Sequence, residues 1–418
     1  MQFKNKMIPQ NVLILGLVGP EPNSSAAGTR MIQLIKLFLK QNWKVTFATA
    51  AADSEFMFDV TTLGVEKVSI AINDSSFDHF IKELNPTLVL FDRFVVEEQL
   101  GWRVAESCPD ALRILDTEDL HCLRLARQKA LKEKTEFKTE DLFSDTAKRE
   151  IASILRCDIS LMISEVEMEL LQNHFKIDKK LLYYLPFMVE PIDETVIAIW
   201  PKYEDRKDFI FIGNFLHEPN WNTIQYIKES VWPLIRKQLP GVSMLVYGAY
   251  PSQKVLQLHK PEQHFFVMGR AESAEAVVKK ARVVLAPIRF GAGAKGKLIE
   301  AMQCGTPSVT TAVGAESMNG TLPWNGIIAD DTQEIADAAF KLYQNEALWQ
   351  QAQGKGIEII NKRYSKELFE DDFINHLLSI QKSTQQHRLE NFFGALLHHH
   401  TTASTKYMSK WIEEKNNK

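Results

Sequence analysis

The chain has 418 residues, of which 45% are hydrophobic and 24% are charged, and its formal net charge is -4 at pH 7. This length predicts two domains, or three, because one ordinary core does not extend so far. The composition is typical of a soluble globular protein, and the balance of charge excludes nucleic-acid binding as a bulk property. Four scattered cysteines favour a reducing cytoplasm over a disulfide framework and form no paired metal spacing: Cys108, Cys122, Cys157 and Cys304.

The first ten residues do not have the pattern of a signal peptide, because the apolar run that follows them is short and typical of a strand. No stretch reaches the roughly 20 apolar residues that span a bilayer. Three adjacent histidines, His398, His399 and His400, cannot share one helix face, so we do not expect a metal site there.

Strand and helix signals alternate through the first half. Residues 11–18 form an apolar run of the kind found in strands buried on both faces, and residues 30–41 have helical periodicity. Further strands are predicted at 44–49, 87–91, 112–115 and 159–163. Such alternation predicts a parallel sheet that helices cover on both faces.

The pattern restarts after a charged segment that contains several prolines. The second series of predicted strands is 209–212, 243–247, 264–267, 283–286, 308–310 and 326–328, and the predicted helices include 222–239, 332–343 and 346–360. We therefore predict an α/β fold of two doubly wound, Rossmann-like domains facing across a cleft. The expected parts are a domain at 1–190, a linker at 191–207, a domain at 208–370 and a helical tail at 371–418. We expect the tail to pack back on the body; the alternative is a loose end after about Lys382.

A loop of small residues opens a short predicted helix in the second half: Gly291, Ala292, Gly293, Ala294 and Lys295. The backbone N–H groups of such a loop can approach an anion at the positive end of the helix dipole. Lys297 and Glu300 lie three residues apart and share one helix face. A cation for phosphate beside a carboxylate for sugar hydroxyls indicates a nucleotide or nucleotide-sugar site.

Two more turns of this half follow predicted strands, where α/β sheets bind ligands. The first contains Gly213, with Asn214, His217 and Asn220 as possible donors to phosphate, and the second adds the carboxylate of Glu316. The alternative for each turn is ordinary turn chemistry.

Polar residues also follow strands of the first half. Asp116, Asp119 and His121 could move a proton or hold sugar hydroxyls; for the aspartates the alternative is a helix N-cap. Asp92 and Arg93 end another strand and could line the cleft, although a surface ion pair would equally explain Arg93.

The loop at 22–28 could let a ligand lie close through Ser25 and Gly28. It has one glycine where a dinucleotide fingerprint has three, which disfavours NAD binding. Two basic stretches are interpreted as solvated helix faces, with contact to an anionic membrane that presents a lipid-linked acceptor as the alternative. They contain Arg30, Lys36, Lys40 and Lys44, and Arg124, Arg127, Lys129, Lys132 and Lys134.

Taken together, these motifs resemble the C-terminal domain of retaining glycosyltransferases of the GT-B fold, family 4. The resemblance is carried by His217-Glu-Pro-Asn220, Gly291-Ala-Gly293, Lys297-Leu-Ile-Glu300, Gly305-Thr-Pro307 and Gly314-Ala-Glu316. It covers about residues 208–345 strongly and reaches the first half more loosely through 22–30 and 116–121. It implies a sugar nucleotide held mainly by the C-terminal domain, an acceptor held mainly by the N-terminal domain, and no metal or other cofactor. It places Glu300 at the donor ribose, the 291–295 backbone near sugar and diphosphate, and Lys297 at the diphosphate.

The chain departs from this family at three places, one of which is Ser317, where a glycine commonly follows the residue that matches Glu316. Many members have a glutamate eight positions before the residue that matches Glu300, where it contacts the donor sugar, and Ala292 stands here instead. Many also have an arginine and a lysine after the first strand of this domain, where this chain has Asn214. Arg289 or Lys295 could substitute for them at the phosphates.

The leading hypothesis is a cytoplasmic glycosyltransferase that moves a sugar from a nucleoside diphosphate to a hydroxyl of a glycan, lipid-linked or small-molecule acceptor. Stabilisation of the leaving diphosphate and domain closure would lower the barrier, and retention follows from the resemblance alone. The catalytic candidates are Asp119, His121 and Lys297, and those on the acceptor side are Ser25, Gly28, Asp92, Arg93 and Asp116. The alternatives are a nucleotide-sugar epimerase, which needs no acceptor, and a non-catalytic protein that binds a glycan or partner. We also consider peripheral contact with the inner membrane face.

Overall fold

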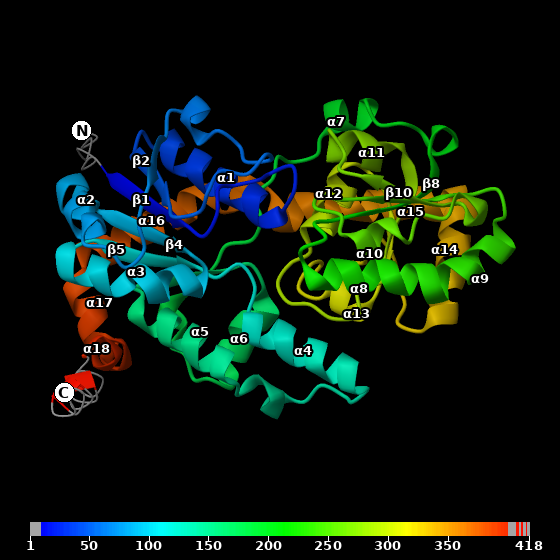
Figure 1. Ribbon diagram of the computed structural model, residues 1–418. Coiled ribbons are helices and arrows are strands. Elements are labelled where there is room, and N and C mark those ends of the chain that lie inside the picture. Colours follow the sequence, from blue (N-terminus) through cyan, green and yellow to red (C-terminus); the bar gives the residue numbers. More distant parts are fainter. Residues whose placement is uncertain (1–9, 400–406, 409–410, 413–414, 416–418) are drawn as a thin grey trace.

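The computed structural model describes residues 10–399, 407–408, 411–412 and 415. Two parallel β-sheets with their helices form two lobes that lie side by side, and the chain returns from the second lobe to the first through its last helices (Figure 1). The predicted fold class is confirmed. His400, one of the three adjacent histidines, lies outside the described residues.

The sheet of the first lobe has seven strands in the order β3-β2-β1-β4-β5-β6-β7. These are β1 (Asn11–Gly16), β2 (Lys44–Thr49), β3 (Glu66–Ser69), β4 (Leu88–Asp92), β5 (Leu112–Asp116), β6 (Ile159–Met162) and β7 (Leu182–Tyr184). The central strands β4 and β5 are buried at every residue, as apolar runs between two layers of helices should be. Two strands were not predicted, because β3 is largely polar and β7 has only three residues.

Six helices accompany this sheet: α1 (Ala26–Lys40), α2 (Ser76–Leu84), α3 (Arg93–Ser107), α4 (His121–Glu133), α5 (Asp145–Arg156) and α6 (Glu165–Asn173). Helix α1 begins four residues before the predicted start, because the Ser25 hydroxyl accepts a hydrogen bond from the Gly28 N–H and caps it there. Its Arg30 is fully buried, so the interpretation of that residue as part of a solvated face is wrong.

The second sheet repeats the plan of the first, with the strand order β10-β9-β8-β11-β12-β13. Its strands are β8 (Lys207–Ile212), β9 (Met244–Tyr247), β10 (Phe265–Gly269), β11 (Ala281–Ala286), β12 (Ser308–Thr310) and β13 (Gly326–Ile328). The helices are α8 (Glu218–Tyr226), α9 (Trp232–Gln238), α10 (Gln253–Leu256), α11 (Ala274–Lys280), α12 (Gly296–Gln303), α13 (Ala312–Ala315), α14 (Thr332–Gln344) and α15 (Glu346–Ile359). In both sheets the strand order reverses beside the first strand, and ligands of such folds bind at that point.

The segment between the sheets packs against the second lobe. It contains the short helix α7 (Glu194–Ala198) and the buried Trp200, whose ring lies where a side chain at Gly305 would be. The buried Arg206 donates to the Thr306 hydroxyl at 2.7 Å and to the Cys304 carbonyl at 3.0 Å. These contacts attach the connection to the C-terminal domain.

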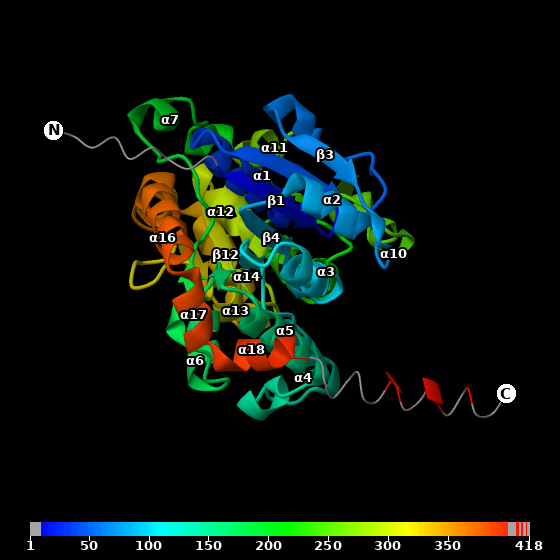
Figure 2. The ribbon, with the colours of Figure 1, turned by 90° about the vertical axis from the view of Figure 1, so that its left-hand side faces the viewer.

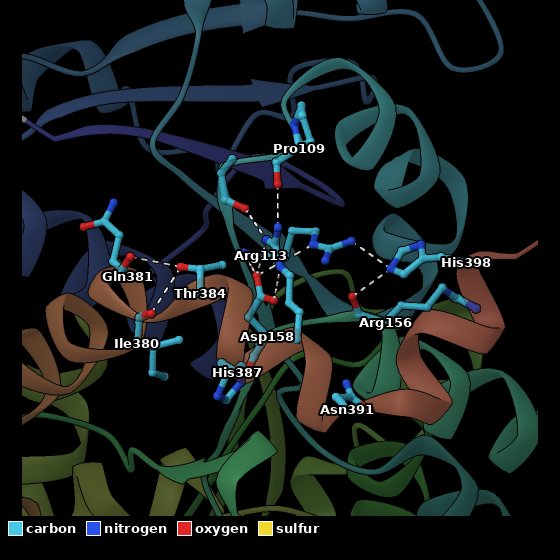
Figure 3. Close-up of polar contacts among 12 residues, drawn as sticks. Pro109, Arg113, Arg156, Asp158, Ile380, Gln381, Thr384, His387, Asn391 and His398 are labelled. Carbon is cyan, nitrogen blue, oxygen red and sulfur yellow. Dashed lines mark hydrogen bonds and ion pairs between the residues drawn. The ribbon is translucent and has the colours of Figure 1, made fainter.

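The tail packs on the first lobe through three helices: α16 (Glu370–Lys382), α17 (Thr384–Glu390) and α18 (Phe392–His398). Apolar residues of α16, such as Phe373 and Leu377, join the core beneath the first sheet. Farther along, the Arg388 guanidinium binds both carboxylate oxygens of the buried Asp158 at 2.7 Å, within a polar cluster that ties α17 to the first lobe (Figure 3). Helix α18 lies beside α5 (Figure 2), and the Asn391 amide at its N-cap donates to the Leu155 carbonyl of α5 at 2.8 Å, so the chain is anchored well beyond Lys382.

Candidate active site between the two domains

The loops at the reversal points of the two sheets meet between the lobes. A Cβ atom at Gly296, the first residue of α12, would lie 2.5 Å from the Ala26 side chain at the start of α1. The loop before α1 and the loop before α12 are therefore in contact. The sequence assigns these two loops to the acceptor side and the donor side.

Lys297 and Glu300 lie in the first turns of α12, and both are partly exposed. The Lys297 ammonium donates to the Asn220 side-chain oxygen at 2.9 Å, which joins α12 to α8. Loss of hydration, together with the nearby charge of Lys295, lowers the pKa of Lys297 to about 8, although Glu300 opposes the shift. Burial raises the pKa of Glu300 to about 7. Both groups therefore titrate near neutral pH, as groups at functional sites often do.

Several polar groups in the turn between β8 and α8 form hydrogen bonds within the turn itself. The Asn214 carboxamide oxygen accepts the Leu216 N–H at 2.8 Å, and the Asn220 amide donates to the Asn214 carbonyl at 2.7 Å. Gly213 is needed here because a Cβ atom would lie 2.7 Å from the Asn220 amide nitrogen. His217 stands at the N-cap of α8 and makes no side-chain cap bond there.

On the N-terminal side, Asp119 and His121 lie together at the start of α4. The Asp119 carboxylate accepts a hydrogen bond from Arg124 at 2.6 Å and lies 3.5 Å from the His121 ring. Burial lowers the pKa of His121 to about 4, so the ring is neutral at pH 7. Loss of hydration also lowers the pKa of His217, an effect that Asp119 opposes from the other domain. The charge of Asp119 therefore acts on both histidines, but its contact in the structure is with His121.

Three predicted acceptor-side residues have structural partners. Asp116 is fully buried and forms an ion pair with the buried Arg30, whose guanidinium also donates to the Leu185 carbonyl. Asp92 accepts the Leu17 N–H at 3.0 Å and lies 3.6 Å from the Arg93 guanidinium. The structure thus places Asp116 inside the N-terminal domain, paired with Arg30, and a direct contact of its carboxylate with an acceptor stays a prediction.

Arg127 forms an interdomain bridge that sequence reasoning missed. Its guanidinium binds both carboxylate oxygens of Glu316, at 2.7 and 2.8 Å, and donates to the Gly291 carbonyl at 2.9 Å. The sequence suggested a solvated helix face or contact with an anionic membrane for this arginine, because no local pattern shows that its partners lie in the other domain. The bridge occupies Glu316, which was predicted to contact the donor.

The donor-side loop itself is buried against the N-terminal domain. Ala292 packs within an apolar cluster of that domain, and the Gly293 N–H donates to Glu167 of α6 at 2.6 Å. Lys295 is also buried and donates to the Gly293 carbonyl at 2.6 Å. Arg289, by contrast, binds the side chain of Asn222. Of the two candidate substitutes at the phosphates, Lys295 is therefore the one within the donor loop.

An open groove of about 450 Å³ borders these contacts. Helix α6 contributes Glu165 and Glu169 to one wall, and Glu316 and Ser317 belong to the other. No helix in the described part of the chain is both long and apolar enough to cross a bilayer. Within the same residues, no three side chains of His, Cys, Asp or Glu are grouped as metal ligands would be.

Comparison with known proteins gives a family for part of the chain. Residues 206–345 match the family model of glycosyl transferases group 1. No curated protein matches the chain.

Solved structures of similar shape cover nearly the whole chain. One is S. aureus TarM in complex with fondaparinux, alpha-GlcNAc-glycerol and UDP, with 10% identity, a TM-score of 0.65, and coverage of 88% of this chain and 99% of that one. Anabaena HepE in complex with UDP and glucose has 14% identity, a TM-score of 0.64, and coverage of 88% and 100%. Sucrose-phosphate synthase from Thermosynechococcus elongatus has 13% identity, a TM-score of 0.64, and coverage of 90% and 98%. At these identities the likeness shows the fold, which is GT-B.

Proposed function

We propose that this chain of the GT-B fold, whose residues 206–345 match the family model of glycosyl transferases group 1, is a glycosyltransferase that moves a sugar from a nucleoside diphosphate to an acceptor hydroxyl. The observation that carries the proposal is the start of α12. There, Lys297 and Glu300 follow a loop whose Gly293 N–H donates to Glu167 of the other domain. A cation and a helix N-terminus suit a diphosphate, and a carboxylate suits the ribose hydroxyls.

In the proposed reaction, the bond between the sugar and the diphosphate breaks while the acceptor oxygen bonds to the same carbon. The leaving diphosphate takes the acceptor proton, and the configuration of that carbon is retained. Lys297 and the N-terminus of α12 stabilise the negative charge that develops, so that no metal ion is needed. His121 is neutral at pH 7 and holds the sugar by a hydrogen bond instead of acting as the base.

Domain movement is part of this proposal. The donor loop is buried between the lobes, and Arg127 bridges them to Glu316. A donor would enter when the lobes separate, and closure would exclude water from the reacting groups.

The first experiment is a thermal-shift screen of the full chain against UDP, GDP, ADP and their sugars, because a ligand of the folded state raises its stability by about 2.7 kcal/mol at 100 times Kd. UDP comes first, since TarM and HepE were solved with it. Calorimetry then compares Lys297→Ala and Glu300→Ala with Lys280→Ala, an exposed lysine at the end of α11. We expect at least about tenfold weaker binding for Lys297→Ala, because hydrogen bonds to charged groups contribute about 1.5–3 kcal/mol. If Lys297→Ala and Glu300→Ala bind every nucleotide with the same affinity as the control variant, the proposal is refuted.

A labelled sugar nucleotide incubated with the protein separates the enzyme classes. Transfer to an added glycan or glycerol derivative, or slow release of free sugar, supports a transferase. An isomer of the donor formed without any acceptor would indicate an epimerase instead. Donor binding with neither product across a broad acceptor screen would indicate a non-catalytic protein.

We also propose that the protein works in the cytoplasm and touches the inner membrane face when its acceptor is lipid-linked. Exposed lysines on α4 and exposed aromatic residues on α18, including Phe392 and Phe393, support this. Co-sedimentation with vesicles containing an anionic lipid, but not with purely zwitterionic vesicles, is the expected result. Equal recovery from both, or from neither, would contradict electrostatic attachment.

A further inference from the structure

The first turn of α6 contacts the C-terminal domain at two neighbouring places. The Ser317 hydroxyl bonds the Ser164 hydroxyl at 2.8 Å and accepts the Val166 N–H at 3.1 Å. One residue farther, Glu167 accepts the Gly293 N–H of the donor loop at 2.6 Å. The start of α6 is therefore where the N-terminal domain holds the donor loop.

Glu167 joins this loop to the start of α4. The carboxylate oxygen that accepts the Gly293 N–H, Oε1, also accepts the Leu120 N–H at 3.3 Å. Leu120 immediately precedes His121, a catalytic candidate. The Glu167 side chain is fully buried, and its second oxygen, Oε2, has no hydrogen-bond partner among the described residues. Buried polar atoms of this kind usually have a partner, such as a bound ligand or water.

The donor loop fits this contact through small residues. A Cβ atom at Gly293 would lie 2.9 Å from Ile163 and 3.0 Å from Asp119, and its φ of +63° favours glycine. The preceding Ala292 is the position where the resembling family often has a glutamate, and here it packs into the N-terminal domain. The loop therefore has no carboxylate of its own at this point and meets one from the other domain.

We propose that Glu167 is a positioning residue for the transfer reaction, supplying from the N-terminal domain the carboxyl group that the donor loop lacks at Ala292. By accepting hydrogen bonds from two backbone N–H groups, it holds the Gly293 amide and the start of α4 in a fixed position relative to each other when the lobes close. This inference rests on the proposed function for its role, but the contact itself is independent of any ligand.

The chemistry of the site suggests a discriminating substitution. Burial raises the pKa of Glu167 to about 8, with the nearby charge of Asp119 adding to the effect and the hydrogen bonds from the Gly293 and Leu120 N–H groups opposing it, followed by Lys295. The side chain is therefore mostly uncharged at pH 7. Glutamine has the same reach, no charge and a carbonyl oxygen, so Glu167→Gln keeps the bridging acceptor, whereas Glu167→Ala removes it.

Hydrogen exchange of the full chain without ligand tests the contact. In Glu167→Ala we expect amide exchange to be about five- to tenfold faster in both the peptide covering 288–298 and the peptide covering 117–124. This factor corresponds to the loss of about one net hydrogen bond in each segment. Glu167→Gln should exchange like the wild type, and so should the matched control Glu169→Gln, an exposed residue of the same helix. If Glu167→Ala does not fold, Glu167→Asp, which is one methylene shorter, gives the same test.

A kinetic measurement tests the role. With UDP-glucose as the probe, Glu167→Ala should lower the rate of sugar release more than tenfold while the Kd for UDP stays within about threefold, and Glu167→Gln should restore the rate. Unchanged exchange in Glu167→Ala, exchange that rises in only one of the two peptides, or equal damage in Glu167→Gln would overturn the inference. Failure of the wild type to bind any nucleotide would instead remove the proposed function and leave the exchange result standing.

Discussion

The pKa of Lys297 predicts how donor affinity changes with pH. A value of about 8 leaves roughly nine-tenths of the lysines protonated at pH 7 and about one-tenth at pH 9. If the diphosphate binds only the protonated form, the apparent Kd for UDP-glucose should rise about tenfold between these two pH values. The cause is structural, because loss of hydration and the neighbouring Lys295 lower the pKa from the ordinary range of lysine.

Calorimetry from pH 7 to pH 9 on the wild type and on Lys297→Arg checks this. Arginine stays charged throughout the range, so its Kd should be nearly flat, even if the different geometry makes binding weaker overall. Titration of the ligand itself is common to both proteins and cancels in the comparison. Glu300 becomes more negative above about pH 7, which favours protonation of Lys297 and moves the midpoint upward. Equal slopes for the two proteins would refute the assignment of Lys297 to the diphosphate.

Three further predictions concern the contacts that hold the chain together. Arg127→Ala and Glu316→Ala should each lower kcat, and the double variant should show a coupling of about 1.5–3 kcal/mol in kcat/KM, as expected for hydrogen bonds between charged groups. Arg388→Ala should lower the free energy of unfolding by about 3 kcal/mol in urea at pH 7, because it leaves the buried Asp158 without two bonds. Burial alone would raise the pKa of Asp158, but Arg388 and Arg113 lower it overall. The contribution of this ion pair to the free energy of unfolding is therefore present above about pH 4 and disappears as the pH falls further. Gly293→Ala should weaken domain contact and raise hydrogen exchange in the donor loop without lowering the unfolding midpoint of the N-terminal domain.

Local pattern was enough to predict most of the architecture. Apolar runs and the turn residues between them predicted β1, β2 and most strands of both sheets, because strands buried on both faces consist of nearly continuous apolar residues. The edge strands β3 and β7 were not predicted, since short edge strands need no such apolar run. Helix periodicity placed α1 but not its start, which a single serine hydroxyl sets.

The position of the predicted donor-side residues at one helix end could be predicted for a similar reason. Lys297, Glu300 and the glycine loop lie within ten residues of one another, and their spacing alone assigns them to one helix end. Arg127 and Glu167 could not be found in this way. Their partners, Glu316 and Gly293, lie more than a hundred residues away in sequence, and the only local signal, charge on a helix, is equally typical of a solvated face.

The two helix ends that meet at the interface differ in a way that decides where a negative group belongs. The first N–H groups of α4 are already occupied: Glu150 accepts those of His121 and Cys122 at 2.7 Å, and Glu167 accepts that of Leu120. The N-cap residue of α12, by contrast, is Lys295, which makes no side-chain cap bond. A helix N-terminus attracts anions through its unpaired N–H groups and its dipole. Since carboxyl groups already satisfy α4, the proposed diphosphate would bind at α12, and the proposed acceptor and sugar would lie on the side that carries His121.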